Sequence, residues 1–295
     1  MSRVSSKTRF YNFFRFLILK SRLYVLLRFL TKGRRSDYFF SKLVPNNYQF
    51  SKSTFKIARV NRGIALKVDL HDYLGHFVYF GFRDEGQEKL MDLVREGDYV
   101  FDVGTNIGNT ILQFSQTIKK DGLVFGFEPD PKTYKFCTSN LKLNPHIKNI
   151  QVFNYGLGNK SGEFQLEDRY ESNSGGNRII IEEVTGKSKN VIVKVLDEIV
   201  EELKLKKLDL IKIDVEGFEL NVLLGAKKTI SQFHPIFFIE IDDNNLRDQG
   251  SSAKELIEFL SGKGYSTYHS ITGKEIISTD HFSGCHFDLI AKYNA

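Results

Sequence analysis

The stretch Tyr99-Val-Phe-Asp-Val-Gly-Thr-Asn-Ile-Gly108 decides the fold, because an apolar run ends in an acid and continues into a glycine-spaced turn. A second apolar run, Leu123-Val-Phe-Gly-Phe-Glu-Pro-Asp130, places Glu128 20 residues beyond Gly108. Two strands joined by a helix in this way form a βαβ unit, in which glycines let a ligand approach the backbone and the acid binds ribose hydroxyls. The two stretches therefore predict a nucleoside-binding unit.

The spacing of the glycines indicates which kind of nucleoside is bound. Gly104 and Gly108 are four residues apart, whereas a dinucleotide fingerprint needs G-x-G-x-x-G. Thr105 and Asn106 stand where that pattern places its second glycine, so the turn offers polar side chains as well as backbone amides. We therefore expect Gly104, Asn106 and Gly108 to contact a cofactor other than NAD.

Strand and helix patterns alternate from residue 98 onward, which is typical of an α/β fold with a mainly parallel sheet and helices on both faces. Residues 155–195 interrupt this alternation and are expected to form an inserted hairpin region within a core at 98–295. The expected strands are 99–103, 123–128, 150–153, 208–214, 236–241, 265–269 and 286–291, and the expected helices are 107–119, 131–143, 219–230 and 252–262.

Two segments precede this core. Residues 1–36 form a basic, apolar arm that is expected to be helical, and residues 37–97 form a hairpin and helix region. β-structure is expected over residues 55–80, where Asn61-Arg-Gly63 makes a short hairpin connection. A helix is expected over 85–95.

Composition and charge limit the classes of function. The chain has 295 residues, 41% hydrophobic content and a net charge of +6. Residues 1–36 contain ten Lys and Arg and no acid, so the rest of the chain carries about −4. This distribution argues against a nucleic-acid-binding body. Cys137 and Cys285 stand in no paired motif, which favours a reducing, cytoplasmic location.

The arm leaves three interpretations open. Its longest uncharged apolar run, Leu23 to Leu27, is far shorter than a spanning helix needs. Residues 6–32 could lie peripherally on an anionic membrane, pack on the body or on a second subunit, or act as a transit-type presequence.

Acids end several of the predicted core strands. In a doubly wound sheet the ligand lies over the carboxyl ends of the strands, where Asp102, Glu128 and Asp214 are expected to gather, with Glu240 nearby. Asp102 could instead cap the glycine turn. Asn154 could hydrogen-bond an adenine edge or form a turn before the following glycine.

The segment Leu208-Asp-Leu-Ile-Lys-Ile-Asp-Val-Glu-Gly-Phe-Glu219 is the richest in chemistry. Strand alternation places Lys212 and Asp214 on one face, and a buried lysine needs an anion such as Asp214 or Glu240. Asp214 and Glu216 are positioned to assist deprotonation of a hydroxyl, with Lys212 beside them. Helix capping and an internal ion pair form the structural alternative.

These motifs resemble those of the FkbM-type SAM-dependent methyltransferases over about residues 55–292. The resemblance implies O-methylation, commonly of sugar hydroxyls, with S-adenosyl-L-methionine (SAM) as cofactor. It carries over Asp102, Gly104, Gly108 and Glu128 as cofactor contacts, and Asp214 and Glu216 as active-site acids. The stretches that carry it are Asp102 to Gly108, Phe127 to Pro129, Leu157 to Gly162 and Ile211 to Glu219, supported by Asp72 to Gly75 and Tyr79 to Gly81.

The sequence predicts no metal site. His281-Phe-Ser-Gly-Cys-His286 matches no closed zinc pattern, and acids near Asp214 could hold Mg²⁺ without any motif that requires it, so no metal ligand is predicted. The expected function is O-methylation of a sugar hydroxyl in a glycan or glycolipid. The alternatives are a methyltransferase for a non-sugar small molecule and a membrane-tethered, non-catalytic SAM-binding interaction protein.

Overall fold

The computed structural model describes residues 6–169, 172–180 and 187–294. Contacts divide the chain into two compact units. The first unit is Met1–Asp84 with Tyr170–Gly175, and the second unit is Glu85–Arg169 with Gly176–Ala295. The segment boundaries predicted after residues 36 and 97 were drawn from charge and sequence patterns, whereas the two units are defined by contacts. The predicted boundaries therefore stay predictions.

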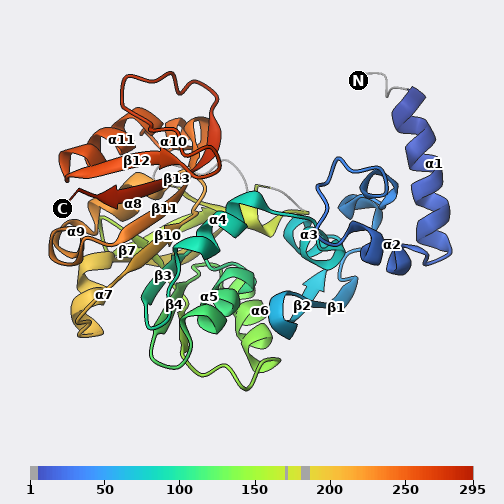
Figure 1. Ribbon diagram of the computed structural model, residues 1–295, viewed down its shortest axis with the longest axis horizontal. Coiled ribbons are helices and arrows are strands. Elements are labelled where there is room, and N and C mark those ends of the chain that lie inside the picture. The colour runs from blue at the N-terminus through green and yellow to red at the C-terminus, as the bar shows by residue number, and fades with distance from the viewer. Residues whose placement is uncertain (1–5, 170–171, 181–186, 295) are drawn as a thin grey trace. The chain divides into compact units, whose positions relative to one another are not determined.

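The second unit is built on a seven-stranded sheet with the order β12-β13-β11-β10-β3-β4-β5 (Figure 1). Only β13 is antiparallel to its neighbours β11 and β12. This topology is Rossmann-like and confirms the predicted α/β class with a mainly parallel sheet, and it brings the carboxyl ends of β3, β4 and β10 to one edge of the sheet. The strands are β3 (Tyr99–Val103), β4 (Leu123–Phe127), β5 (Ile150–Phe153), β10 (Leu210–Ile213), β11 (Ile236–Asp242), β12 (Tyr265–His269) and β13 (His286–Tyr293).

Both faces of this sheet are buried. On β3, Phe101 belongs to one hydrophobic cluster and Val100 to another, and β10 divides in the same way between Ile211 and Leu210. Successive strand side chains point to opposite faces, so both faces must be covered by helices. The covering helices are α4 (Glu85–Leu93), α5 (Asn109–Ile118), α6 (Pro131–Lys142), α7 (Leu196–Glu202), α8 (Glu219–Leu224), α9 (Lys227–Phe233), α10 (Asp243–Asp248) and α11 (Ala253–Gly262).

Two helical details differ from the sequence expectation. The helix expected over 219–230 is divided into α8 and α9, because the chain turns at Gly225, where a Cβ would clash with the backbone oxygen of Gly158. The short helix α10 was not predicted. It starts because the Asp242 carboxylate accepts hydrogen bonds from the backbone N–H groups of Asn244 and Asn245.

The expected insertion forms a separate four-stranded sheet, in the order β6-β9-β7-β8. Its longest strands, β7 and β9, are antiparallel and pair Gly162 with Val193. Apolar side chains such as Val191 and Val193 pack into the main core, so the insertion is part of the folded second unit. The strands are β6 (Gly156–Gly158), β7 (Gly162–Glu167), β8 (Arg178–Ile180) and β9 (Ser188–Val195), with the one-turn helix η4 (Ser174–Gly176) between β7 and β8.

The first unit contains a two-stranded hairpin and several helices. The expectation of β-structure is confirmed for β1 (Phe55–Arg59) and β2 (Ala65–Asp69), which are joined by the one-turn helix η3 (Asn61–Gly63). It is wrong for α3 (Tyr73–Phe80). The Asp72 carboxylate accepts a hydrogen bond from the Gly75 N–H at 3.1 Å and starts this helix. Since its residues are apolar on nearly all sides, periodicity could not separate strand from helix.

The predicted helical arm consists of two helices, α1 (Ser6–Lys20) and α2 (Tyr24–Thr31), with Arg22 between them at φ 59°. Helix α2 is followed by the one-turn helices η1 (Ser41–Leu43) and η2 (Asn47–Gln49). The Thr31 hydroxyl donates to the Phe80 carbonyl at 2.7 Å, which attaches α2 to α3. Within the described ranges, every helix is too short or too polar to cross a bilayer.

Candidate active site

The turn after β3 is held closed by the neighbouring strand ends. The backbone N–H groups of Gly104 and Thr105 both donate to the Phe127 carbonyl, at 3.0 and 3.1 Å. Gly104 has φ 87°, and a Cβ there would clash with the backbone oxygen of Asp214. Glycine is therefore required at this position, because the backbone at the end of β10 leaves no room for a side chain on the turn.

Glu128 lies directly against this turn. Its carboxylate accepts hydrogen bonds from the Asn106 N–H and the Asp130 N–H, each at 2.9 Å. Burial raises the pKa of Glu128 to about 7, although these two backbone donors oppose the shift. One donor to each oxygen leaves lone pairs that a ligand hydroxyl can use. The structure thus brings Asn106 and Glu128 together, as the βαβ motif predicts.

A buried ion-pair cluster lies at the centre of the sheet. Lys212 on β10 is the direct neighbour of Asp102 on β3. Its Nζ lies 3.4 Å from Asp102 Oδ1 and 3.0 Å from Asp214 Oδ2. The expected contact with Asp214 is confirmed, whereas the partnership with Asp102 was missed because the two residues are 110 positions apart in the sequence.

The attraction between the two side chains keeps Lys212 protonated and Asp214 ionised. Burial opposes the charge on Lys212, but the carboxylates of Asp214 and Asp102 outweigh it and raise the lysine pKa above its usual range. Burial also opposes the charge on Asp214, and the Lys212 ammonium lowers the pKa of that carboxyl. The Asp214 side chain is 41% exposed, so it is accessible to a ligand. The charge of Asp214, together with burial, raises the pKa of neighbouring Glu240, which favours its protonated form.

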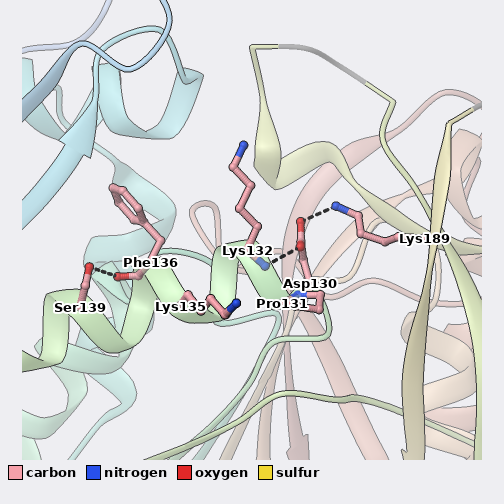
Figure 2. Close-up of a pocket in the computed structure, with 7 residues that line it drawn as sticks. All are labelled: Asp130, Pro131, Lys132, Lys135, Phe136, Ser139 and Lys189. Carbon is pink, nitrogen blue, oxygen red and sulfur yellow. Dashed lines mark hydrogen bonds and ion pairs between the residues drawn. The ribbon is translucent and has the colours of Figure 1, made fainter.

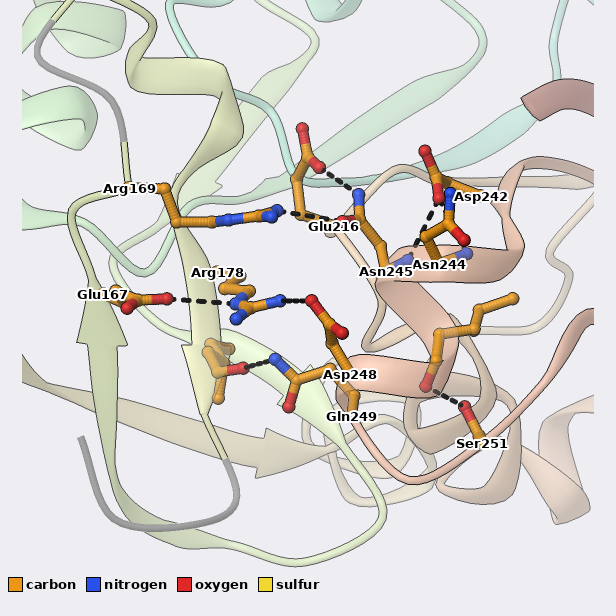
Figure 3. Close-up of polar contacts among 12 residues, drawn as sticks. Glu167, Arg169, Arg178, Glu216, Asp242, Asn244, Asn245, Asp248, Gln249 and Ser251 are labelled. Carbon is orange, nitrogen blue, oxygen red and sulfur yellow. Dashed lines mark hydrogen bonds and ion pairs between the residues drawn. The ribbon is translucent and has the colours of Figure 1, made fainter. Parts of the chain in front are cut away.

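Glu216 lies on the loop after β10 and differs from Asp214 in its surroundings. Its backbone has φ 56°, a conformation that costs free energy in a residue with a side chain. The Asn245 side-chain amide donates to Glu216 Oε2 at 2.7 Å, and Arg169 donates to the Asn245 carbonyl oxygen at 2.9 Å (Figure 3). Burial raises the pKa of Glu216 to about 7, the charge of Asp214 adds to this shift, and Arg169 opposes it.

The strained loop is held by Glu219 at the start of α8. Glu219 Oε1 accepts from the N–H groups of Val215 at 3.2 Å and Gly217 at 3.0 Å. Gly217 has φ 101° and lies so close to Asn245 that a Cβ would clash with its backbone oxygen. Glu219 therefore fixes the loop on which Glu216 stands, whereas helix α8 itself has no side-chain cap.

Asn245 and Arg169 were missed by sequence reasoning, since no motif marks them. Arg169 follows β7 of the insertion, and Asn245 lies on α10. The same two elements are tied together by Arg178, which donates to Glu167 at 3.1 Å and to Asp248 at 2.8 Å (Figure 3). The insertion thus supplies a guanidinium that is bound to Asn245 of α10 and acts electrostatically on Glu216.

Asn154 lies close to Glu128, but its side-chain amide donates hydrogen bonds to backbone carbonyl groups. It donates to the carbonyl of Glu128 at 2.9 Å and to that of Pro129 at 3.1 Å. These contacts favour the turn-forming alternative, and a contact with an adenine edge stays a prediction.

A pocket of about 500 Å³ lies at the start of α6, beginning at Asp130, two residues after Glu128 (Figure 2). The Asp130 carboxylate at its edge accepts from the Lys132 N–H at 2.9 Å and from Lys189 Nζ at 2.8 Å. Lysines on α6 and β9 make its rim basic. The sequence analysis did not predict this pocket. Its lining residues are Asp130, Pro131, Lys132, Lys135, Phe136, Ser139 and Lys189.

Within residues 6–169, 172–180 and 187–294, no group of three or more His, Cys, Asp or Glu side chains is arranged to hold a metal ion. The acids near Asp214 are instead engaged with Lys212, Asn245 and backbone amides.

Comparison with known proteins agrees with this geometry. Residues 102–267 match the methyltransferase FkbM domain. The hexuronic acid methyltransferase AglP of Haloferax volcanii is 29% identical over 180 residues, covering 60% of this chain and 67% of that protein. The 2-O-methyltransferase NoeI of Sinorhizobium fredii is 24% identical over 190 residues, covering 58% of this chain and 75% of that protein.

Among solved structures, the methyltransferase FkbM of Methylobacillus flagellatus aligns with a TM-score of 0.44 and 15% identity, covering 94% of this chain and 60% of that chain. The family match, in contrast, spans more than half of the chain and contains the glycine turn, Glu128 and the segment from Lys212 to Glu219. The chain therefore belongs to the FkbM methyltransferase family, and it is a SAM-dependent methyltransferase.

Proposed function

We propose that the chain methylates a hydroxyl group of a sugar, in a glycan or a glycolipid. The name of one relative, a hexuronic acid methyltransferase, supports a sugar acceptor, and the name of another, a 2-O-methyltransferase, supports transfer to an oxygen atom. The single observation that carries the proposed transfer to a hydroxyl is Glu216, a partly buried carboxyl held by Asn245 at 2.7 Å, whose pKa of about 7 suits a base acting at neutral pH.

The residues around the glycine turn fit SAM. The side-chain oxygen of Asn106 is buried, and no described group donates a hydrogen bond to it, whereas the buried Asp102 carboxylate has the Lys212 ammonium as its partner. A buried oxygen like that of Asn106 is costly unless a ligand donor meets it. Glu128 retains acceptor capacity for ribose hydroxyls, and the glycines Gly104 and Gly108 let a ligand approach the backbone. The last proposed contact is that of Asn154 with the adenine edge of SAM.

We assign different roles to the two acids that follow β10. When bound, SAM supplies an electrophilic methyl group on a positively charged sulfur. Asp214 stays ionised beside Lys212, so its charge can favour a cation in the cleft and keep Lys212 in place. Glu216 is closer to half-ionised at neutral pH and can accept the proton of the acceptor hydroxyl. Holding the acceptor oxygen in line would supply much of the acceleration.

The test is an acceptor screen with SAM carrying a labelled methyl group. The panel contains neutral sugars, uronic acids, lipid-linked saccharides, and non-sugar phenols and carboxylic acids. Transfer to saccharides alone supports the proposal, and transfer to a non-sugar small molecule alone contradicts it. SAM binding without transfer to any acceptor would favour a non-catalytic role, provided that hydrolysis of SAM is also absent.

A further inference from the structure

The N-terminal arm, which we define as residues 6–32, exposes an unusual amount of apolar surface. Nearly half of the exposed large hydrophobic side chains in the described residues lie within it. Phe29 is 71% exposed and Phe13 is 61% exposed. The rings of Phe10 and Phe13 both contact that of Phe14, and soluble proteins rarely leave exposed apolar clusters without a partner. The exposed members are Phe10, Phe13, Phe14, Phe16, Leu17, Leu23, Val25, Leu26, Phe29 and Leu30.

The arm is attached to the first unit along one side only. Tyr24 and Leu27 are buried, and the Tyr24 ring packs edge-on against Phe50 with centroids 5.2 Å apart. Helix α1 is attached near its middle, where Arg15 Nε donates to the Lys42 carbonyl at 3.0 Å. The arm is therefore a placed element whose remaining surface is available to something outside the unit.

The charge of the arm indicates what that partner is. Residues 1–36 contain ten Lys and Arg and no acid. Basic groups stand directly beside exposed rings, with Lys20 Nζ 4.7 Å from the centre of the Phe16 ring and the Arg28 guanidinium 5.6 Å from that of Phe29. This mixture suits the headgroup level of an anionic leaflet, where rings enter the apolar boundary and cations meet phosphates.

We propose that the arm lies on the surface of an anionic lipid bilayer and holds the enzyme there. The helices are too short to span, so the association is peripheral. A dimer formed arm to arm would bring two acid-free basic surfaces together, which is electrostatically unfavourable. A lipid surface, in contrast, satisfies both the charge and the exposed rings.

Co-sedimentation with vesicles tests this proposal. The full-length protein is mixed with vesicles of phosphatidylcholine containing about one third phosphatidylserine, and with vesicles of phosphatidylcholine alone. We expect sedimentation with the anionic vesicles, weakened by salt, and little with the neutral ones. A protein that stays in the supernatant with both would overturn the proposal, as would equal binding to both at all salt concentrations.

Two arm variants and one control separate the contributions. Neutralising two cations, as in Arg9→Gln with Lys20→Gln, should weaken binding about 25-fold, since each basic residue contributes about fivefold. Phe13→Ser with Phe29→Ser should weaken it by about tenfold or more. The control, Ile271→Ser with Ile277→Ser, removes side chains of the second unit that are 46% and 52% exposed and should bind normally.

Three further measurements make the result decisive. Circular dichroism and SAM binding show that each variant is folded, and sedimentation equilibrium without vesicles measures assembly. If the phenylalanine variant abolishes a dimer while vesicle binding persists, the arm is an assembly element and the proposal is wrong. Vesicle binding needs no methyl transfer, so its outcome is independent of the acceptor screen.

Discussion

Two groups of charged residues lie within a few positions of each other on and after β10, yet they are built in opposite ways. Lys212 projects from the sheet itself and pairs with Asp102 and Asp214 at 3.4 and 3.0 Å. Glu216 stands on a strained loop and is held by the neutral Asn245 amide at 2.7 Å. The first group keeps a fixed charge, whereas the second has a pKa of about 7 and can exchange a proton.

This difference shows how one short segment can serve both stability and chemistry. An ammonium within reach of a carboxylate lowers the carboxyl pKa, so Asp214 is a weak base. Replacing the ammonium by an amide, as at Glu216, holds the carboxyl in position without lowering its pKa to the same extent. The proposed division of roles follows from the partner each acid has.

The largest expected effect is on stability. Lys212→Met leaves Asp102 buried without its cation, and breaking a buried pair in this way costs about 3–5 kcal/mol of unfolding free energy. Urea denaturation measures it. The matched control is Lys207→Met, because the Lys207 side chain is 46% exposed and pairs with Asp209 at 3.3 Å. That control should cost less than about 1 kcal/mol.

The double variant Lys212→Met with Asp102→Asn sharpens this test. It removes both charges, so part of the lost stability should return. If Lys212→Met were no more destabilising than Lys207→Met, the buried cluster would not have the structural role assigned to it.

The next effect is on turnover. Glu216→Gln keeps the shape and the contact with Asn245 but removes the base, so turnover should fall about 100-fold or more while SAM affinity is retained. Single-turnover assays with a saccharide acceptor measure it. Glu201→Gln, an exposed acid on α7, is the control and should retain full activity. Near-normal turnover in a folded Glu216→Gln protein would leave Glu216 without a catalytic role.

The third-largest expected effect is on the affinity for the cofactor. Glu128→Ala should weaken SAM binding by about 1–3 kcal/mol, the range for hydrogen bonds to a charged group. Isothermal titration calorimetry measures it. Glu128 also braces the N–H groups of Asn106 and Asp130, so denaturation must first show that the variant is folded. Unchanged affinity in a folded variant would remove Glu128 from the cofactor site.

The smallest effect concerns positioning. Asn245→Ala removes one hydrogen bond to Glu216, which is worth about 1 kcal/mol, or roughly a fivefold loss of turnover. The pH midpoint of turnover should also shift, because the Glu216 carboxyl changes its surroundings. Asn244→Ala on the same helix has an exposed side chain and is the control. A shift in both variants would indicate a general effect of disturbing α10.

The sequence predicted the sheet and its glycine turn because these depend on local patterns. Apolar runs ending in an acid gave β3 and β4, and the four-residue spacing of Gly104 and Gly108 gave the turn between them. Helix α3 was missed, since an apolar run on all sides has no distinguishing period. The capping of α10 by Asp242 was also missed, although an acid before two asparagines is a recognisable start signal.

The site could be predicted only as far as single segments allow. Lys212 and Asp214 are two apart on one strand, so their contact followed from alternation. The partnership of Lys212 with Asp102 depends on β3 and β10 being neighbours in register, which local sequence does not specify. Arg169 and Asn245 come from the insertion and from α10, and only the folded chain brings them to Glu216.

The pH dependence of single-turnover methyl transfer tests most directly whether Glu216 is the base. Its pKa is raised, so it is protonated and inactive well below pH 7 and ionised above. The rate should therefore rise about tenfold per pH unit up to about pH 7 and then level off, and Glu216→Gln should abolish this rise. A wild-type midpoint near the usual glutamate pKa of about 4.3, or an unchanged profile in Glu216→Gln, would contradict the account.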